Sequence, residues 1–190
     1  MKQSLGAKAY LYPMPVLVIG TYNDDGPPDA MTMAWGGVCD FGKVALNLEE
    51  EHLTSDNVKK RMAFTLAIAD SAHIAEADYV GTVSGKKVPD KVAKCGLHAV
   101  KSAHVDAPVF EEFPLTLECK VLELQHGIGG FRVLGEIVNT LADPSILGAD
   151  GEIDSEKVDA AIFDTAHSAY YRTGEKLGTA WEMGSGQFGK

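Results

Sequence analysis

The chain has 190 residues, 45% of them hydrophobic, which is enough to bury a core without disulfides or metals. Its formal net charge of -10 argues against nucleic acid or an anionic membrane as the main partner, because both would repel it. Cys39, Cys95 and Cys119 are odd in number and far apart, which favours buried, reduced thiols over a disulfide framework. No apolar run is long enough to span a bilayer, and no signal peptide is expected. We therefore expect a cytoplasmic protein with a single domain, residues 1–190.

Alternating and β-branched hydrophobic residues predict six strands in chain order. The first two strands flank a turn cluster at residues 23–26, and the last two are long and flank the glycine-rich residues 126–130. Each of these pairs is expected to form an antiparallel hairpin. On composition alone, Gly36 and Gly37 indicate a bulge at the edge of the core. The predicted strands are residues 16–22, 29–35, 43–48, 64–69, 113–124 and 131–143.

The predicted helices are few and short. Thr54 or Ser55 is expected to cap a helix that has three basic residues in its last turn, where cations suit the helix dipole. Helical segments are also expected at residues 71–85 and 155–163, whereas residues 170–190 are expected to be irregular. Because helices are scarce, a doubly wound parallel sheet is disfavoured. A mainly β fold, an antiparallel barrel with appended short helices, fits the pattern best.

Two glycine-rich segments lack the spacing of the nucleotide-binding motifs that they resemble. GTVSGKK has one residue too few between its glycines for a P-loop and no Ser or Thr after its lysine. HGIGGFRVLG lies between two strands and does not open a helix, as a dinucleotide fingerprint would. The six histidines show no metal-ligand spacing, and no Ser-His-Asp arrangement is present. Neither a metal site nor a catalytic side chain is therefore expected.

Polar and basic side chains nevertheless gather at the predicted strand ends and around a helix N-terminus. Hydroxyls, amides and lysines in such a place are typical of a site for a phosphate-bearing ligand. Each also has a structural explanation, because a threonine can cap a helix, an asparagine can close a turn and a lysine pair can simply be solvated. The residues alone leave both explanations open. They are Thr32, Asn47, His52, Thr54, Asn57, Ser84, Lys86, Lys87 and Lys91.

Eight segments stand in a recognisable order along the chain. They are YLYPMPVLVIGTY, DAMTMAWGG, HLTSDNV, VSGKKVPDK, DAPVFEEFPLTLEC, GEIV, ADPSILGADG and YYRTG with LGTAW. Together they resemble the flavoredoxin group of the flavin reductase-like, FMN-binding split-barrel family. The resemblance covers nearly the whole chain and implies a six-stranded antiparallel split barrel, active as a homodimer with FMN near the subunit interface. It also implies electron transfer, with electrons supplied by NADH or NADPH or by a redox partner protein.

The resemblance further implies which residues would contact FMN. Four consecutive residues of the second strand would line the isoalloxazine ring, and two residues of the third strand would follow. The next helix and an SGK loop would contact the phosphate, and two tyrosines near the C-terminus would close the site. The flavin itself carries the chemistry, and Trp35 is expected to decide whether a nicotinamide can reach it. The implied contacts are Thr32, Met33, Ala34, Trp35, Asn47, Leu48, Thr54, Asn57, Ser84, Lys86, Lys87, Tyr170 and Tyr171. His52 is a further candidate contact, because a phosphate bound by a protein of net charge -10 needs nearby compensation.

Two features depart from the wider family. Many members carry a histidine, associated with nicotinamide binding, a few residues before the glycine and glutamate of GEIV. Here that place is Gly130, and His126 is displaced from it. LEEEHLT is acidic where related sequences often carry basic residues. A nicotinamide donor and a protein donor therefore both remain open, as does a non-catalytic module that binds flavin or haem.

Overall fold

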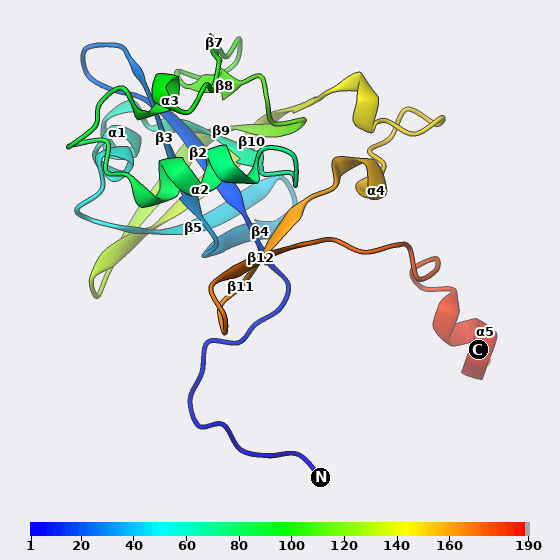
Figure 1. Ribbon diagram of the computed structural model, residues 1–190. Helices are drawn as coiled ribbons and strands as arrows, with labels where there is room; N and C mark the ends of the chain where they lie inside the picture. Colours follow the sequence, from blue (N-terminus) through cyan, green and yellow to red (C-terminus); the bar gives the residue numbers. More distant parts are fainter. Residues whose placement is uncertain (189–190) are drawn as a thin grey trace.

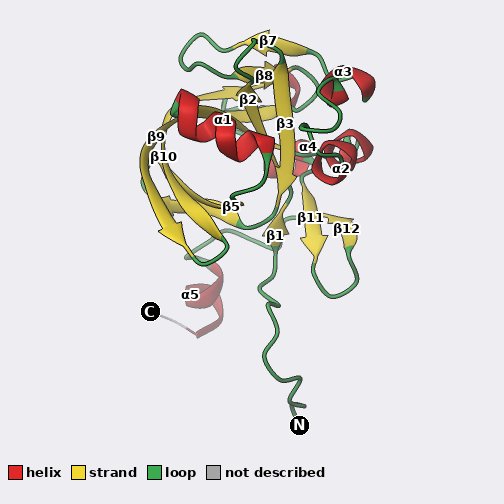
Figure 2. Cartoon of the chain, turned by 90° about the vertical axis from the view of Figure 1, so that its left-hand side faces the viewer, coloured by secondary structure: helices red, strands yellow, loops and turns green. Residues whose placement is uncertain are grey.

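The computed structural model describes residues 1–188, and most of the strands belong to one seven-stranded antiparallel sheet. These strands are β2 (Leu17–Tyr22), β3 (Pro28–Met33), β4 (Gly36–Asp40), β5 (Lys43–Glu49), β6 (Ala63–Ile68), β9 (Leu115–Gly127) and β10 (Gly130–Ala142). They run in the order β3-β2-β6-β9-β10-β5-β4, and the sheet is strongly curved (Figure 1 and Figure 2). Both predicted hairpins, β2–β3 and β9–β10, are confirmed. The mainly β, antiparallel split-barrel class is confirmed too.

Smaller sheets and short helices complete the fold. Figure 1 shows α2 lying across β2 and β3; this helix occupies the middle of the predicted helical segment, residues 71–85. Within residues 1–188, no helix is long and apolar enough to cross a membrane. The remaining strands are β1 (Met14–Pro15), β7 (Ala99–Lys101), β8 (Pro108–Phe110), β11 (Ala161–Asp164) and β12 (Ala169–Arg172). The helices are α1 (Leu53–Arg61), α2 (Ile74–Thr82), α3 (Lys91–Lys94), the 3-10 helix η1 (Pro144–Ile146), α4 (Ser155–Val158) and α5 (Met183–Phe188).

β2 is buried on both faces because it separates two hydrophobic clusters. Leu17 and Ile19 point into the barrel cluster, where Phe64 is fully buried. Val18 points the other way, into an outer cluster that β2 forms with α2 and α3. A strand covered on both sides reads as a continuous apolar run rather than an alternating one. The start of α1 lies beside β3 (Figure 2).

The strand predicted over residues 29–35 is shorter than expected, and the chain after it forms a further strand. β3 ends at Met33, and Gly36 begins β4, which pairs with β5 along the edge of the sheet. A Cβ on Gly36 would lie 2.6 Å from the Leu46 side chain and 3.1 Å from the carbonyl oxygen of Ala45, so a larger residue would have to displace Leu46. The interpretation of Gly36 and Gly37 as a bulge is therefore wrong. They open an additional strand, which is why the main sheet has seven strands.

Helix α1 has His52 as its N-cap, so the prediction of Thr54 or Ser55 as the cap is wrong. Both hydroxyls have other partners. Ser55 donates to the carbonyl oxygen of Glu49 at 2.6 Å, and Thr54 donates to the carboxylate of Asp29 at 2.5 Å. Both hydroxyls donate to hydrogen-bond acceptors outside the helix, and folding is what brings these acceptors close. The sequence pattern of a helix cap therefore could not predict where this helix begins.

The C-terminal part of the chain contains more strand than its sequence predicts. Residues 155–163, predicted as one helix, form α4 and most of β11, and α4 stops after one turn because Asp159 is left-handed with φ 48°. Phe163 on β11 packs against the outer cluster. Residues 170–172 of β12, which pairs with β11, lie in the predicted irregular segment 170–190, as does α5. Residues 189–190 of that segment lie outside the described residues.

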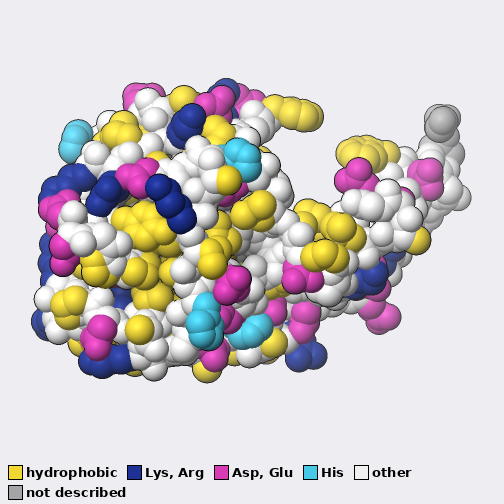
Figure 3. Space-filling model, turned by 90° about the horizontal axis from the view of Figure 1, so that it is seen from above, with side chains coloured by type: hydrophobic (Ala, Val, Ile, Leu, Met, Phe, Trp, Pro, Cys, Tyr) yellow, Lys and Arg dark blue, Asp and Glu magenta, His cyan; other side chains and the backbone are white. Residues whose placement is uncertain are grey.

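Both ends of the chain extend away from the barrel (Figure 1 and Figure 2). Seen from above, the C-terminal segment is an arm that stands apart from the body and carries hydrophobic side chains (Figure 3). Leu177 and Trp181 on this segment are 87% and 98% exposed. These side chains gain no burial within their own chain.

The N-terminal segment is attached to the β11–β12 turn through Asp164. This carboxylate accepts hydrogen bonds from the Tyr12 hydroxyl and from the Ala166 N–H, and it pairs with His167 Nδ1 at 2.6 Å. The bond from Tyr12, followed by that from His167, lowers the pKa of Asp164 from 3.8 to about 2. Because the pKa of Asp164 is lower in the folded state, the ionised carboxylate stabilises the fold above about pH 3.8. This contribution disappears as the pH falls toward about 2.

Replacing Asp164 with asparagine should therefore flatten the acid side of the stability profile. Between about pH 4 and about pH 2, the unfolded wild type takes up a proton at Asp164 that the folded protein refuses, so its free energy of unfolding falls. Asp164→Asn has no such proton to take up. Urea unfolding at both pH values measures the two slopes, and equal slopes would show that the Tyr12 and His167 contacts do not hold in solution.

Of the three cysteines, all within the described residues, Cys119 alone is buried, so the expectation of three buried thiols is wrong. Cys39 is exposed on β4, and burial raises the pKa of the Cys119 thiol to about 12. Because the thiolate is the reactive form, we expect iodoacetamide at about pH 8 to modify Cys39 first and to spare Cys119 until the protein unfolds. Mass mapping of peptides after timed alkylation measures this order. Early modification of Cys119 would contradict its buried position.

Candidate functional site

A cavity of about 680 Å³ lies where the end of β3, the end of β5, α1 and the β9–β10 hairpin meet. We call it the ring cavity. Its apolar wall is formed by Met31 and Met33 of β3, Leu48 of β5 and Phe131 of β10, with Trp35 at the edge. Cofactor sites are typically mostly apolar clefts of about this size with a few polar groups that fix orientation.

Hydrogen bonds join the polar groups at one side of the ring cavity. Arg132 lies directly opposite Asn47 in the pairing of β10 with β5, and its Nε donates to Asn47 Oδ1 at 3.2 Å. The Asn47 amide in turn donates to the carbonyl oxygen of Trp35 at 3.2 Å, and its backbone N–H donates to the same oxygen at 2.9 Å. The guanidinium, the amide and the bend after β3 are thereby held together.

Two nitrogen groups of the ring cavity, the exposed guanidinium of Arg132 and the imidazole of His52, have bonding capacity left for a ligand. Among residues 1–188, no carboxylate forms a salt bridge with Arg132. Within the same described residues, His52 Nδ1 is buried without a hydrogen-bond partner, while its Nε2 lies 3.8 Å from Glu49. Buried polar atoms are nearly always bonded, and guanidinium groups suit planar or anionic acceptors. In a protein of net charge -10, these two groups favour a ligand that is anionic or rich in acceptors.

The ring cavity brings together several residues that the resemblance implies as FMN contacts. The Thr32 hydroxyl, however, faces α2 and donates to the carbonyl oxygen of Ala77 at 2.5 Å. Ala34 is buried and does not line the cavity. The implied contacts that do line it are Thr32, Met33, Trp35, Asn47 and Leu48, together with the further candidate His52.

The residues implied as phosphate contacts lie on the other side of the α1 N-terminus. Asn57 and Lys86 line a second cavity of about 470 Å³, together with Leu53. His52 lines the ring cavity, and the next residue, Leu53, lines the second cavity. The two cavities therefore lie on either side of the start of α1. Ser84 and Lys87 are exposed on the loop of residues 84–87, in which Gly85 is buried.

Several of these polar side chains are already bonded inside the protein. Asn57, 2% exposed, donates its amide to Thr21 Oγ1 at 3.1 Å and to Asn23 Oδ1 at 2.8 Å. Lys86 pairs with Asp56 at 2.8 Å. Thr54 is likewise 2% exposed and bonded to Asp29, as described above. The structural explanation and the ligand explanation therefore remain compatible for this group, because a bonded side chain can still order the backbone around a ligand.

The implied tyrosines lie on β12. Tyr170 is connected to the ring cavity through a row of rings, with Trp35 and Phe163 6.4 Å apart and Phe163 and Tyr170 5.9 Å apart. Burial and a hydrogen bond to Asp78 at 2.7 Å raise the pKa of Tyr170 to about 12. Tyr171 is 56% exposed and does not line the ring cavity.

Sequence reasoning missed the residues that the β9–β10 hairpin contributes. Arg132 reaches the cavity only because the register of β10 places it across from Asn47. A predicted register for this pair of strands would have found it. The missed lining residues of the hairpin are residues 125–132; Met31 of β3 and Glu49 of β5 were missed as well.

Comparison with known proteins agrees with this geometry. The family model described as flavin reductase like domain matches residues 9–156. Flavoredoxin of Desulfovibrio vulgaris (Miyazaki F) is 38% identical, with 97% of this chain and 100% of that chain covered and a TM-score of 0.92. Flavoredoxin from Methanosarcina acetivorans is 24% identical, with 98% of each chain covered and a TM-score of 0.88, and shares the fold.

A curated relative, an uncharacterized protein of Aeropyrum pernix, is 25% identical over 128 residues, which make up 66% of this chain and 48% of that protein. The match therefore spans about half the length of this relative. The family model, by contrast, matches well over half of the present protein, residues 9–156 of 190. The chain belongs to the flavin reductase-like domain family.

Proposed function

We propose that the protein binds FMN and acts as an FMN-dependent oxidoreductase of the flavoredoxin type. The observation that carries this proposal is the ring cavity, which joins an apolar wall to two nitrogen groups. Among residues 1–188, the Arg132 guanidinium has no carboxylate partner, and the buried Nδ1 of His52 has no hydrogen bond. FMN combines a flat, largely apolar ring system with a polar edge and a phosphate. The residues present fit both demands, and the 38% identical flavoredoxin supports the same assignment.

The side chains divide the work between ring and phosphate. Met33 and Trp35 would bind the ring, and Asn47 and Arg132 would orient its polar edge. We further propose that the N-terminal turn of α1 and residues 84–87 bind the phosphate, as the resemblance implies. When bound, FMN supplies electron transfer, and nearby charges set its potential. A cation such as Arg132 would favour the reduced form.

We propose a protein as the electron donor. Where members of the wider family carry a histidine associated with nicotinamide binding, Gly130 lies so close to β5 that a Cβ would overlap the carbonyl oxygen of Leu48. Trp35, 52% exposed at the cavity edge, narrows the approach to the ring. NADH or NADPH is the alternative donor.

We also propose that the protein forms a single domain and a cytoplasmic homodimer. The exposed apolar side chains of the C-terminal segment support a second copy as partner, because such side chains are usually buried at interfaces (Figure 3). Measuring the mass in solution by light scattering tests the dimer.

The decisive experiment for the proposed function is flavin binding. We expect the isolated protein to be yellow, or to quench FMN fluorescence at micromolar concentration. Protein that is colourless and leaves FMN fluorescence unchanged would exclude the proposal, and a haem spectrum would identify the non-catalytic alternative. Anaerobic mixing with NADH and with NADPH then separates the donors, because a partner-dependent carrier should bleach only slowly with either nucleotide.

A further inference from the structure

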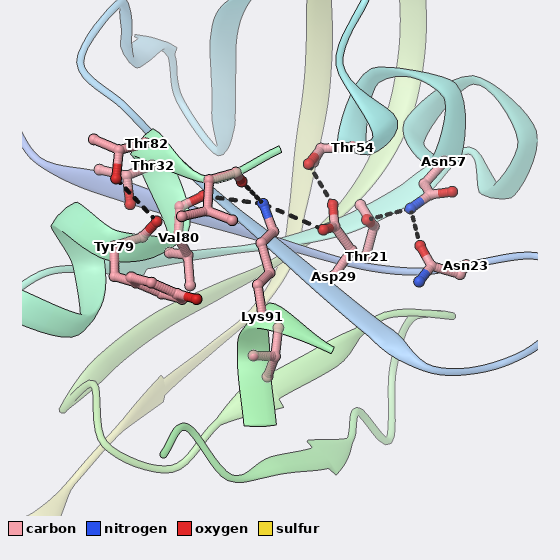
Figure 4. Close-up of polar contacts among 12 residues, drawn as sticks. Thr21, Asn23, Asp29, Thr32, Thr54, Asn57, Tyr79, Val80, Thr82 and Lys91 are labelled. Carbon is pink, nitrogen blue, oxygen red and sulfur yellow. Dashed lines mark hydrogen bonds and ion pairs between the residues drawn. The ribbon is translucent and has the colours of Figure 1, made fainter. Parts of the chain in front are cut away.

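A buried ion pair joins several segments beside the proposed phosphate site (Figure 4). Lys91 and Asp29 are 3% and 1% exposed, and Nζ lies 3.4 Å from Oδ1. The same ammonium donates to the carbonyl oxygens of Val80 and Val83 at 3.0 Å each and so closes the C-terminal end of α2. The other oxygen of Asp29 accepts the Thr54 hydroxyl. β3, α1, α2 and α3 therefore meet at this ion pair.

The loop of residues 84–87 rests on the same carboxylate. A Cβ on Gly85 would lie 2.5 Å from Asp29 Oδ1 and 2.8 Å from Leu53 Cδ2, closer than a side chain can approach. The glycine thus lets the loop contact β3 and the start of α1 together. The backbone N–H of Lys87 donates to Ser84 at 3.0 Å and makes the loop a tight turn. The position of the loop depends on Asp29 as much as the position of α1 does.

Stability by itself does not account for this pair. Removing two charges from water often costs more than their attraction returns, and apolar side chains of similar volume are often at least as stable. Desolvation accordingly lowers the pKa of Lys91, even though Asp29 opposes the shift. Apolar replacements could fill the space, but they could not accept a bond from α1 and close the end of α2 at once. What the ion pair contributes beyond stability is the position of α1 relative to the end of α2.

We propose that Asp29 and Lys91 form a positioning pair that holds the first turn of α1 and residues 84–87 where they bind the FMN phosphate. This inference rests on the proposed FMN site. Neither side chain is exposed enough to touch the ligand. The ring cavity does not include either residue. The pair therefore determines the preference for FMN over riboflavin, which has the same ring but no phosphate.

The test compares the two flavins on matched variants. Lys91→Met keeps an unbranched side chain, one atom shorter, and removes its charge. We expect the FMN dissociation constant to rise about tenfold while that of riboflavin changes less than about threefold. Lys94→Met removes an exposed lysine from the same short helix and should leave both constants unchanged. Equal effects on the two flavins would overturn the proposal.

A second variant guards against misfolding, because Lys91→Met leaves Asp29 without its cation. The double variant Asp29→Asn/Lys91→Met removes both charges. We expect it to fold, as judged by circular dichroism, and to lose the preference for FMN. A native FMN-to-riboflavin ratio in either folded variant would overturn the positioning role.

Hydrogen exchange on the wild type provides a measurement that needs no variant. FMN should slow exchange in residues 53–57 and 83–91 more than riboflavin does, and equal protection by both flavins would contradict the proposal. Wild-type protein that binds neither flavin would instead refute the proposed function itself. The two failures are therefore distinguishable.

Discussion

Replacing Gly130 with alanine is expected to lower the free energy of unfolding by about 1 to 3 kcal/mol. The added Cβ would overlap the carbonyl oxygen of Leu48 and lie 3.2 Å from its carbonyl carbon and 3.3 Å from the Cα of Glu49. All three atoms belong to the backbone of β5, which pairs with β10 at this point. No side chain can move aside, so β5 and β10 must separate locally. Because Leu48 lines the ring cavity, flavin affinity should fall as well.

Gly127→Ala is the matched control, because Gly127 is the residue that pairs with Gly130 across the same hairpin turn. A Cβ there would lie 3.7 Å from the carbonyl oxygen of Gly130, an ordinary contact, so we expect a change within about 0.5 kcal/mol. Urea unfolding followed by circular dichroism measures both variants. Equal losses would mean that strand pairing at Leu48 does not require a glycine. If only Gly130→Ala lowers the free energy of unfolding, then strand packing explains why this chain has a glycine where many family members carry a histidine.

Local sequence signals predicted the two hairpins correctly. The strands at Gly36 and Phe163 were missed because they depend on pairing with distant parts of the chain. The turn cluster at residues 23–26 lies between two strands that pair with each other, so composition sufficed there. The sequence suggested a bulge at Gly36 because nothing local shows that this residue begins a strand. That strand, β4, is defined by its pairing with β5 at the edge of the sheet. Phe163 lies in a short helical pattern, but pairing of β11 with β1 and β12 overrides that pattern. Propensity is a weak guide wherever tertiary pairing is available.

The candidate site shows the same division. The resemblance implied Asn47 as a flavin contact, and the need to compensate the phosphate charge suggested His52; both line the ring cavity. The resemblance could not show that the Thr54 hydroxyl would be bonded to Asp29, since that contact joins residues far apart in the chain. Arg132 was missed for a related reason, because one residue of register decides which face of β10 it occupies. The residue types were therefore predictable, and their partners were not.

Replacing Arg132 with methionine should weaken both FMN and riboflavin by about 1.5 to 3 kcal/mol, roughly ten- to a hundredfold. Arg132 is bonded to Asn47 in the ring cavity and has no carboxylate partner among residues 1–188. Its charge is available to the ligand, and its loss removes a charge-assisted hydrogen bond. The reduction potential of the bound flavin should also become more negative, because a cation that favours the reduced form is gone. Titration with each flavin and a dye-equilibrium measurement of the potential record the two effects.

Lys120→Met is the control, because it removes an exposed cation from the same hairpin, away from the ring cavity, and makes the same change in net charge. It should leave affinity and potential unchanged, whereas a shared loss would point to long-range charge alone. The comparison of flavins adds a further decision. If Arg132→Met weakens FMN and spares riboflavin, then the phosphate lies beside Arg132 and the ring does not. In that case the assignment of ring and phosphate to the two sides of α1 must be reversed.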